Sequence, residues 1–294
     1  MIRDRSSLLT GLLWTAPWWL GFVCFLAIPM GASLYLSFCD YSLLQPPVFT
    51  GATNYANLAA DPVFHRVVWN TFLYSVLSVP LSTAVALLLA VLLNHSIRGQ
   101  AFFRACIFLP TILPLVAAAM IWMWMLNPEV GLVNAPFRGV GVAPPPWLTK
   151  PGWAMGALVL ISLWFVGSPT VIFLAGLQEI PEELYEAARL DGASGPQRFR
   201  HVTLPGVSPV VLFNFIVAVL TAWQIFALPY VIWRREGGPD GSTYFYTMYL
   251  FDNAFRYLRM GYASAMAWIQ LLIILLVTAL VFRLSRRVVH YSGS

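Results

Sequence analysis

Six long apolar segments, separated by shorter polar stretches, dominate the sequence. A membrane-spanning helix needs about 20 consecutive apolar residues, and each of these segments is long enough. No Asp, Glu, Lys or Arg lies in the interior of any of them. The pattern predicts an all-α integral membrane protein with six transmembrane helices, at residues 12–37, 68–94, 105–126, 153–177, 208–233 and 262–282.

A polar loop at residues 178–207 separates the fourth span from the fifth. Five of the twelve acidic residues of the chain fall in it, namely Glu179, Glu182, Glu183, Glu186 and Asp191. Pro181 suits the first position of a helix, and Gly192 suits its end. A second short helix is expected at residues 197–203, with Pro205 ending the loop. The pattern predicts a helix–turn–helix element that contacts a partner, although a solvated loop with ordinary helix caps would also explain it.

The N-terminus invites comparison with a secretory signal peptide, because Arg3 and Arg5 precede an apolar run. That run, residues 12–36, is about 25 residues long and lacks a clean small-x-small cleavage site, whereas a signal peptide has a shorter apolar region. We therefore interpret it as a retained first span, with a cleaved signal as the alternative.

The distribution of Lys and Arg predicts the orientation of the spans. Cytoplasmic flanks of spans are enriched in these residues. Ten of the seventeen crowd the span ends on one side, and the other seven are spread over longer loops. Both termini and the 178–207 loop are therefore predicted to be cytoplasmic. The ten residues are Arg3, Arg5, Arg98, Arg104, Arg189, Arg198, Arg200, Arg283, Arg286 and Arg287.

Composition agrees with a membrane protein and narrows its chemistry. Charged residues make up 10% of the chain and the mean hydropathy is +0.74, whereas soluble domains carry about 25% charged residues. The net charge of +5 includes a single lysine, Lys150, which favours membrane anchoring over nucleic-acid binding. Three cysteines and four histidines are scattered, so neither a metal site nor a disulfide framework is expected.

The sequence also lacks the motifs of several chemistries. It has no nucleotide-binding loop of the form G-x-x-x-x-G-K and no H-E-x-x-H or G-x-S-x-G motif. Spans without ionisable residues argue against a carrier driven by protons, because proton relays need such residues in the membrane. We infer a pathway-forming protein that is not an enzyme and receives energy from a partner. A stand-alone secondary carrier or channel, and a non-transporting scaffold or enzyme, remain as alternatives.

The polar loop carries a long and specific motif. Residues 186–193 read Glu-Ala-Ala-Arg-Leu-Asp-Gly-Ala, and Gln197, Phe199 and the triplet Thr-Leu-Pro at 203–205 follow. This string resembles the EAA loop of binding-protein-dependent ABC importer permeases. Other stretches resemble the carbohydrate branch, in the manner of the first permease of maltose-type and glycerol-3-phosphate-type systems; they are residues 29–38, 51–55, 70–71, 237–243 and 261–265.

The resemblance implies a type I ABC importer transmembrane domain in the inner membrane of a prokaryote. Such a permease forms half of a pore in the lipid bilayer, together with a second, homologous permease. Two ATP-binding subunits bind and hydrolyse ATP, so we expect no cofactor in this chain. An extracytoplasmic solute-binding protein delivers the substrate, which we expect to be a mono- or oligosaccharide. Glycerol-3-phosphate or another polyol is the alternative.

Residue roles follow on the same basis. The residues expected to couple this chain to the ATPase are Glu186, Ala187, Ala188, Asp191 and Gly192. The two alanines are small, so a partner can approach them closely. Sugar sites combine aromatic faces with a few hydrogen-bonding groups. The residues expected to line the substrate pathway are Trp164, Ser168, Thr221, Trp223 and Gln224. Packing between helices is the alternative role of each.

The expected organisation has three parts. Residues 1–67 comprise an N-terminal cytoplasmic segment, the first span and an outer loop. Residues 68–286 form the ABC importer core of five helices with the coupling loop, and residues 287–294 form a cytoplasmic tail.

Overall fold

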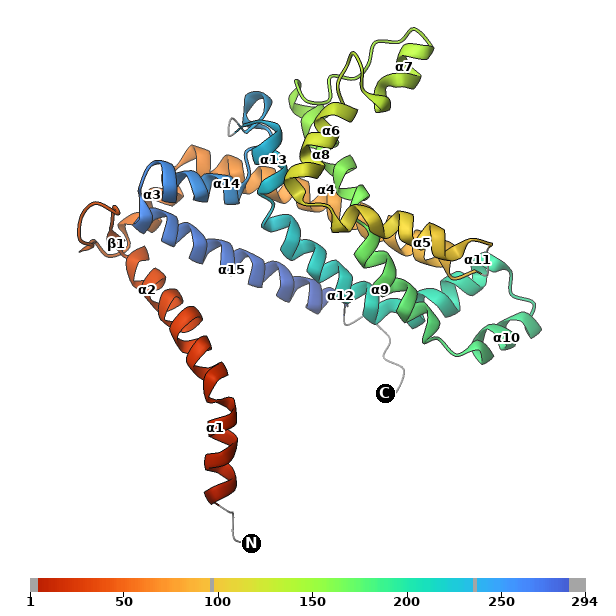
Figure 1. Cartoon of the computed structure of the whole chain (residues 1–294), viewed down its shortest axis with the longest axis horizontal. Helices are drawn as coiled ribbons and strands as arrows, with labels where there is room; N and C mark the ends of the chain where they lie inside the picture. The colour runs from red at the N-terminus through yellow and green to blue at the C-terminus, as the bar shows by residue number, and fades with distance from the viewer. Residues whose placement is uncertain (1–4, 96–97, 235–236, 286–294) are drawn as a thin grey trace. The chain divides into compact units, whose positions relative to one another are not determined.

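The computed structural model describes residues 5–95, 98–234 and 237–285, and helices dominate this part of the chain (Figure 1). Four helices are long and apolar enough to cross a membrane, or six if each of two bent pairs forms one span. The predicted class, a membrane protein built of helices, is confirmed, and the predicted number of six spans is reached when each bent pair counts as one. The orientation across the membrane stays a prediction, and Arg3, Arg286, Arg287 and the tail 287–294 lie outside the described residues.

The chain divides into two compact units. Unit 1 comprises Met1–Pro62 with Leu250–Leu272, and unit 2 comprises Val63–Tyr249 with Ile273–Ser294. The three-part division expected from the sequence is a different kind of grouping, based on spans and loops, and it stays a prediction.

Unit 1 contains the first span and a small polar subdomain. The span runs from Thr10 to Ser37, and it is followed by an antiparallel ladder in which Cys39 pairs with Phe49. Each strand has only two residues, so the all-α prediction is confirmed, and this short hairpin is an addition that the sequence pattern did not predict. The elements of the unit are α1 (Arg5–Phe22), η1 (Val23–Ala27), α2 (Ile28–Ser37), β1 (Cys39–Asp40), β2 (Val48–Phe49), α3 (Thr53–Ala60), η6 (Asp252–Arg256) and the first part of α15 (Met260–Ser285).

The hairpin forms because side chains satisfy its backbone. The buried Asn54 amide donates to the carbonyls of Ser37 and Cys39, at 2.9 and 2.8 Å. The Tyr262 hydroxyl donates to Asp61 at 2.7 Å, which joins the start of α15 to the end of α3. These side-chain contacts hold a turn-rich segment that has little apolar area of its own.

The regular secondary structure of unit 2 is helical in its described part, and loops such as residues 140–150 connect the helices. Its elements are α4 (Pro62–Leu93), α5 (Gln100–Phe108), η2 (Leu109–Ile112), α6 (Leu115–Met125), η3 (Leu132–Asn134), α7 (Ala135–Gly139), α8 (Pro151–Trp164), α9 (Gly167–Gln178), α10 (Glu182–Leu190), α11 (Gly195–Arg198), η4 (Phe199–Thr203), α12 (Leu204–Trp223), α13 (Ala227–Ile232), η5 (Pro239–Gly241), most of α14 (Tyr246–Phe251) and the end of α15.

The third and fourth spans are bent, a feature that the predicted ranges 105–126 and 153–177 did not include. Helices Gln100–Ile112 and Leu115–Met125 meet at 105°. The cause is Pro114, which caps α6 and holds the preceding Leu113 in an extended conformation with ψ 135°. Helices Pro151–Trp164 and Gly167–Gln178 meet at a shallower 48°.

The fifth span begins earlier than expected. We predicted a separate helix at residues 197–203 and a loop end at Pro205, but α11, η4 and α12 form a continuous run within Gly195–Ile232. Pro205 occupies the first turn of α12, where its missing N–H costs little. The preceding segment is a π-helical turn, in which the Leu204 N–H bonds to the Phe199 carbonyl.

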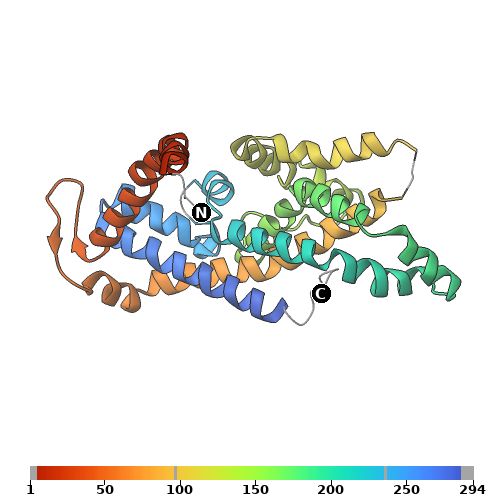
Figure 2. The ribbon, with the colours of Figure 1, turned by 90° about the horizontal axis from the view of Figure 1, so that it is seen from below.

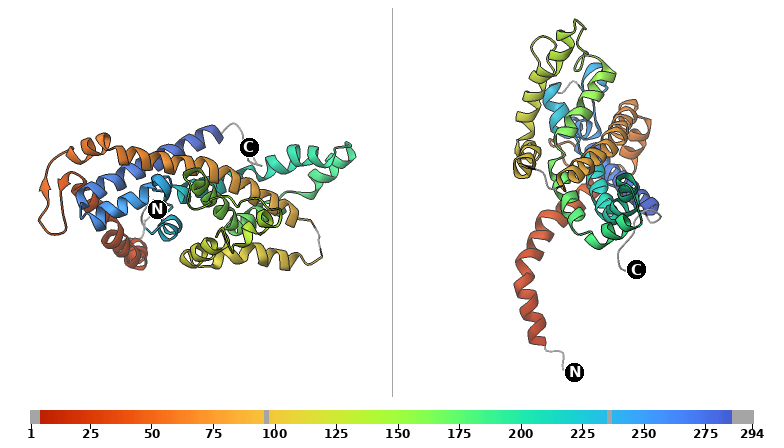
Figure 3. Two further views of the ribbon diagram at one scale, coloured as in Figure 1. Left: turned by 90° about the horizontal axis from the view of Figure 1, so that it is seen from above. Right: turned by 90° about the vertical axis from the view of Figure 1, so that its right-hand side faces the viewer.

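Helices α9 and α12 lie side by side, and α10 and α11 lie at the end of unit 2 beyond them (Figures 2 and 3). Two glycines permit this close packing. A Cβ at Gly176 would lie 2.7 Å from Val210, and one at Gly206 would lie 2.9 Å from Ile180. The two helices thus form a tight stem from which the polar loop projects.

Candidate functional site

The projecting loop starts with α10, whose ends are well defined. Pro181 is the residue that precedes the helix, one position earlier than expected. Glu182 and Glu183 occupy the first turn and Arg189 the last. Acidic side chains near the N-terminus and basic side chains near the C-terminus stabilise a helix, because their charges are opposite to the partial charges of the helix dipole at those ends. The predicted helix is confirmed.

Helix α10 ends in a Schellman turn. The Ala193 N–H bonds to the Ala188 carbonyl at 2.9 Å, and the Gly192 N–H bonds to the Arg189 carbonyl at 3.0 Å. This pair of bonds requires a left-handed residue between them, and Gly192 has a φ of +75°. The prediction that Gly192 ends the helix is confirmed, and the turn direction is fixed by backbone geometry.

A second set of bonds starts α11 three residues later. The Ser194 N–H donates to Gln197 Oε1 at 2.7 Å, and the Ser194 hydroxyl donates to the same oxygen at 2.8 Å. Only Ala193 and Ser194 lie between Gly192 and the start of α11, so the corner of the loop is short and ordered by its own hydrogen bonds.

One side-chain bond ties α10 back to the fifth span. The hydroxyls of Tyr185 and Thr203 lie 3.0 Å apart. Thr203 is buried at the end of the π-helical turn that leads into α12. This bond, absent from our expectations, joins α10 to a transmembrane helix directly.

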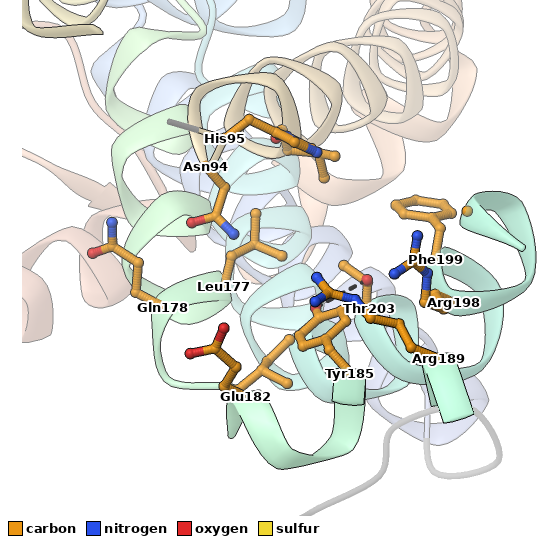
Figure 4. A pocket seen from close by; sticks show the side chains of 13 residues that line it. Asn94, His95, Leu177, Gln178, Glu182, Tyr185, Arg189, Arg198, Phe199 and Thr203 are labelled. Atoms are coloured by element: carbon orange, nitrogen blue, oxygen red, sulfur yellow. Dashed lines mark hydrogen bonds between the residues drawn. The ribbon is translucent and has the colours of Figure 1, made fainter. Parts of the chain in front are cut away.

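Helix α10 has two different faces. Glu182, Tyr185 and Arg189 face a cavity of about 610 Å³ (Figure 4). Glu183, Ala187 and Leu190 follow each other at a spacing of four and then three residues, so they share a face. All three are exposed, and Leu190 is 89% exposed. This second set, together with the exposed Glu186, is called the outer face of α10 below.

The five expected coupling residues differ in their exposure to solvent. Glu186, Ala187, Asp191 and Gly192 are exposed, on α10 or at its end. Ala188 is half-buried, and its carbonyl is used in the Schellman turn. Leu190 was missed, although the four-three spacing from Glu183 through Ala187 in the sequence was enough to place it on the same face.

The expected pathway residues lie beside two helix interruptions. Trp164 ends α8 and Ser168 lies in the first turn of α9. Trp223 ends α12, and Gln224 follows it, before the non-helical Phe226 with φ −143°. One break separates α8 from α9 and the other separates α12 from α13, so each adjoins a helix of the stem.

Burial divides the pathway residues into two groups. Ser168, Thr221 and Gln224 are exposed. Trp223 is 3% exposed and belongs to a large apolar cluster, against which the half-buried Trp164 also packs. Trp164 and Trp223 are thus brought together in one core region, where packing accounts for both.

The next features are the side chains that could bind a metal ion or form a disulfide, within the described residues. No group of three His, Cys, Asp or Glu side chains there is arranged to hold a metal ion. The cysteines at positions 24, 39 and 106 are free, as no disulfide joins them.

The described residues form apolar helices with a hydrogen-bonded polar helix–turn–helix between the fourth and fifth spans, an arrangement that suits a transporter permease. Comparison with known proteins agrees. Residues 78–290 match the family described as "binding-protein-dependent transport system inner membrane component", and the chain belongs to this family. The resemblance to binding-protein-dependent ABC importer permeases is therefore confirmed, and so is the expectation of a transport subunit in the inner membrane.

Relatives match along almost the whole chain. The chain is 40% identical over 292 residues to the probable ABC transporter permease YesP of Bacillus subtilis, covering 98% of this chain and 94% of YesP. It is 35% identical over 286 residues to the sulfoquinovosyl glycerol transport system permease SmoG of Agrobacterium fabrum, covering 96% and 92%.

A solved structure shares the fold. A chain of a bacterial ABC transporter involved in import of the acidic polysaccharide alginate superimposes with a TM-score of 0.81. The two chains are 23% identical and each is covered to 98%. The predicted type of transmembrane domain is therefore confirmed over the whole described fold.

Proposed function

We propose that this chain forms half of the translocation pathway of an ATP-driven sugar importer. A second permease would form the other half, two ATP-binding subunits would supply energy, and an extracytoplasmic binding protein would deliver the sugar. The observation that carries the proposal is the outer face of α10, where a leucine that is 89% exposed lies beside Ala187 and two glutamates. Leu190 offers an apolar contact that the chain itself leaves uncovered, Ala187 allows close approach, and the glutamates can accept charge-assisted hydrogen bonds from a protein partner.

The contacts of α10 support a mechanical role. The Schellman turn, the Ser194–Gln197 bonds and the Tyr185–Thr203 bond fix α10 relative to η4 and α12. A displacement of α10 by closing ATPase subunits would then pass to α12 and, through the Gly176 contact, to α9. Rigid-body movement of packed helices is a common way to alternate between two states. Glu186, Ala187, Ala188, Asp191 and Gly192 would transmit this movement.

The substrate class rests on different observations. SmoG is named for a sugar derivative, sulfoquinovosyl glycerol. In this chain, exposed hydrogen-bonding side chains lie beside the helix interruptions, with Ser168 in α9 and Thr221 and Gln224 at the end of α12. Interrupted helices line substrate sites in many transporters, because they expose backbone and side-chain polar groups. We assign these three residues to sugar contact and the two tryptophans to shaping the pathway wall.

Proteoliposomes that contain the complete importer test the function. We expect uptake of a radiolabelled di- or oligosaccharide that needs both ATP on the ATPase side and the binding protein on the other side. Uptake driven by an ion gradient without ATP would show a secondary carrier instead. Competition by glycerol-3-phosphate or a polyol, but by no sugar, would move the substrate to that class.

A further inference from the structure

The cavity behind α10 adjoins an apolar groove. The cavity and the groove share Val91, Gly195 and Phe199 in their linings. The groove has a volume of about 600 Å³. Its other lining residues are Ala84, Leu87, Leu88, Pro196 and Leu204. The polar cavity, called the chamber below, and the apolar groove therefore adjoin along these three residues, and the two together are called the surface below.

The two ends of this surface differ in chemistry and in position along the second span. The groove residues of α4 lie within its last three turns, inside the apolar segment that ends at Leu93. The chamber lies beyond that end, where Arg189 and Arg198 contribute two positive charges against the single carboxylate of Glu182 in the lining. In the view of Figure 4, both arginines lie across the chamber from Asn94 and His95.

We propose that this surface binds one anionic phospholipid. The phosphate diester would lie between the guanidinium groups of Arg189 and Arg198, and an acyl chain would lie along Leu87, Leu88 and Leu204. Guanidinium groups bind phosphate oxygens with paired hydrogen bonds, and basic pockets at the membrane ends of helices hold anionic headgroups. A free phosphate would match the arginines but would leave the groove uncovered.

The site has a consequence for α10. Glu182, Tyr185 and Arg189 form one wall of the chamber, and Asn94 and His95 at the end of the second span form another. A bound headgroup would bridge α10 to α4 through Arg189. The proposal does not depend on the coupling role or on the sugar, because it needs only the apolar spans and the lining described above.

Lipid retention by the purified complete importer tests the site. The complex is delipidated in detergent, titrated with phosphatidylglycerol, and the bound lipid is counted by native mass spectrometry. The double variant Arg189→Gln/Arg198→Gln should retain the most tightly held phosphatidylglycerol about tenfold more weakly than wild type, since each cationic contact contributes to anionic-lipid binding. Arg200→Gln is the matched control, because Arg200 is exposed on the same loop and lies in neither lining. It should behave as wild type.

A groove variant provides a second test that keeps both arginines. Leu88→Trp fills the groove and should also weaken retention, whereas Leu92→Trp should not. Leu92 lies on the same helix, is 55% exposed and lines neither part of the surface. Equal retention by Leu88→Trp and Leu92→Trp, or by the double arginine variant and Arg200→Gln, would overturn the proposal.

Two competitors distinguish the sources of phosphate. Glycerol-3-phosphate has the phosphate but no acyl chain, and at millimolar concentration it should leave the retained phosphatidylglycerol in place. Phosphatidylethanolamine, which is zwitterionic, should be retained more weakly than phosphatidylglycerol. Displacement by glycerol-3-phosphate would show a soluble-phosphate site, and equal retention of both lipids would show a site that ignores charge; either result contradicts an anionic-lipid site.

Discussion

The hydroxyl of Tyr185 lies 3.0 Å from that of Thr203, and this bond connects a surface helix to a transmembrane one. The two residues are 18 positions apart in the sequence, on opposite sides of the loop corner. Thr203 is buried and Tyr185 is half-buried, so water competes poorly for this bond. The position of α10 relative to α12 therefore depends on one side-chain pair as well as on the backbone turn.

Removal of either hydroxyl should loosen this connection. A single hydrogen bond contributes about 1 kcal/mol, and an orphaned buried hydroxyl costs about 1–3 kcal/mol. Tyr185→Phe and Thr203→Val should each lower the amount of sugar transported per ATP hydrolysed while the complex still assembles. The double variant should lose little more than either single one, because both remove the same bond. Additive losses would show that the two side chains act separately.

The left-handed turn at Gly192 predicts a graded series of substitutions. A side chain in this conformation costs about 1–2 kcal/mol, and asparagine tolerates it better than branched residues do. We expect transport to be highest in the wild type and to fall step by step in Gly192→Asn, Gly192→Ala and Gly192→Val. Gly195→Ala is the control, because a Cβ there meets nothing within 4 Å and its φ is not left-handed. Equal transport by Gly192→Val and Gly195→Ala would exclude a role for the turn.

The stem between α9 and α12 should be sensitive to added volume. Gly176→Ala places a Cβ 2.7 Å from Val210, and overpacking of this kind costs about 1–3 kcal/mol. The thermal midpoint of the solubilised complex should fall, and Val210→Ala in the same chain should restore much of the loss. Gly156→Ala in α8 meets nothing within 4 Å and should leave the midpoint unchanged. Failure of Val210→Ala to rescue would point to a different contact.

The exposed amide of Gln224 should matter for transport and not for assembly. Gln224→Ala removes a hydrogen-bonding group beside the break between α12 and α13, so sugar uptake should fall about tenfold if one bond to the substrate is lost. Basal ATP hydrolysis should persist. Gln45→Ala serves as the control, because Gln45 is an exposed glutamine between the two short strands of unit 1. Unchanged uptake by Gln224→Ala would remove this residue from the pathway.

The sequence predicted those features that depend on local chemistry. Uninterrupted apolar runs located the spans, and the Glu182–Glu183 pair and Gly192 located the ends of α10, because dipole and φ preferences act within a few residues. The exposed position of Leu190 was also readable from helical spacing. The motif around Glu186 indicated the family, which the comparisons then confirmed.

Other features arise from packing and could not be read from the pattern. A proline in an apolar helix is compatible with a straight, kinked or broken span, since neighbouring helices satisfy the freed carbonyls. Pro114 breaks its span at 105°, whereas Pro205 lies in a continuous run. The Tyr185–Thr203 bond and the Gly176–Val210 approach join residues far apart in sequence, so they depend on how the helices pack.

We propose that ATP-driven movement enters this chain through the outer face of α10. The most direct measurement is the ratio of sugar uptake to ATP hydrolysis in proteoliposomes with the complete importer, for Ala187→Trp and for Arg200→Trp as a control on the same loop. A bulky side chain at Ala187 should prevent the close approach of a partner, so uptake should fall to background while Arg200→Trp transports normally. Wild-type uptake by Ala187→Trp would show that movement does not enter through this face.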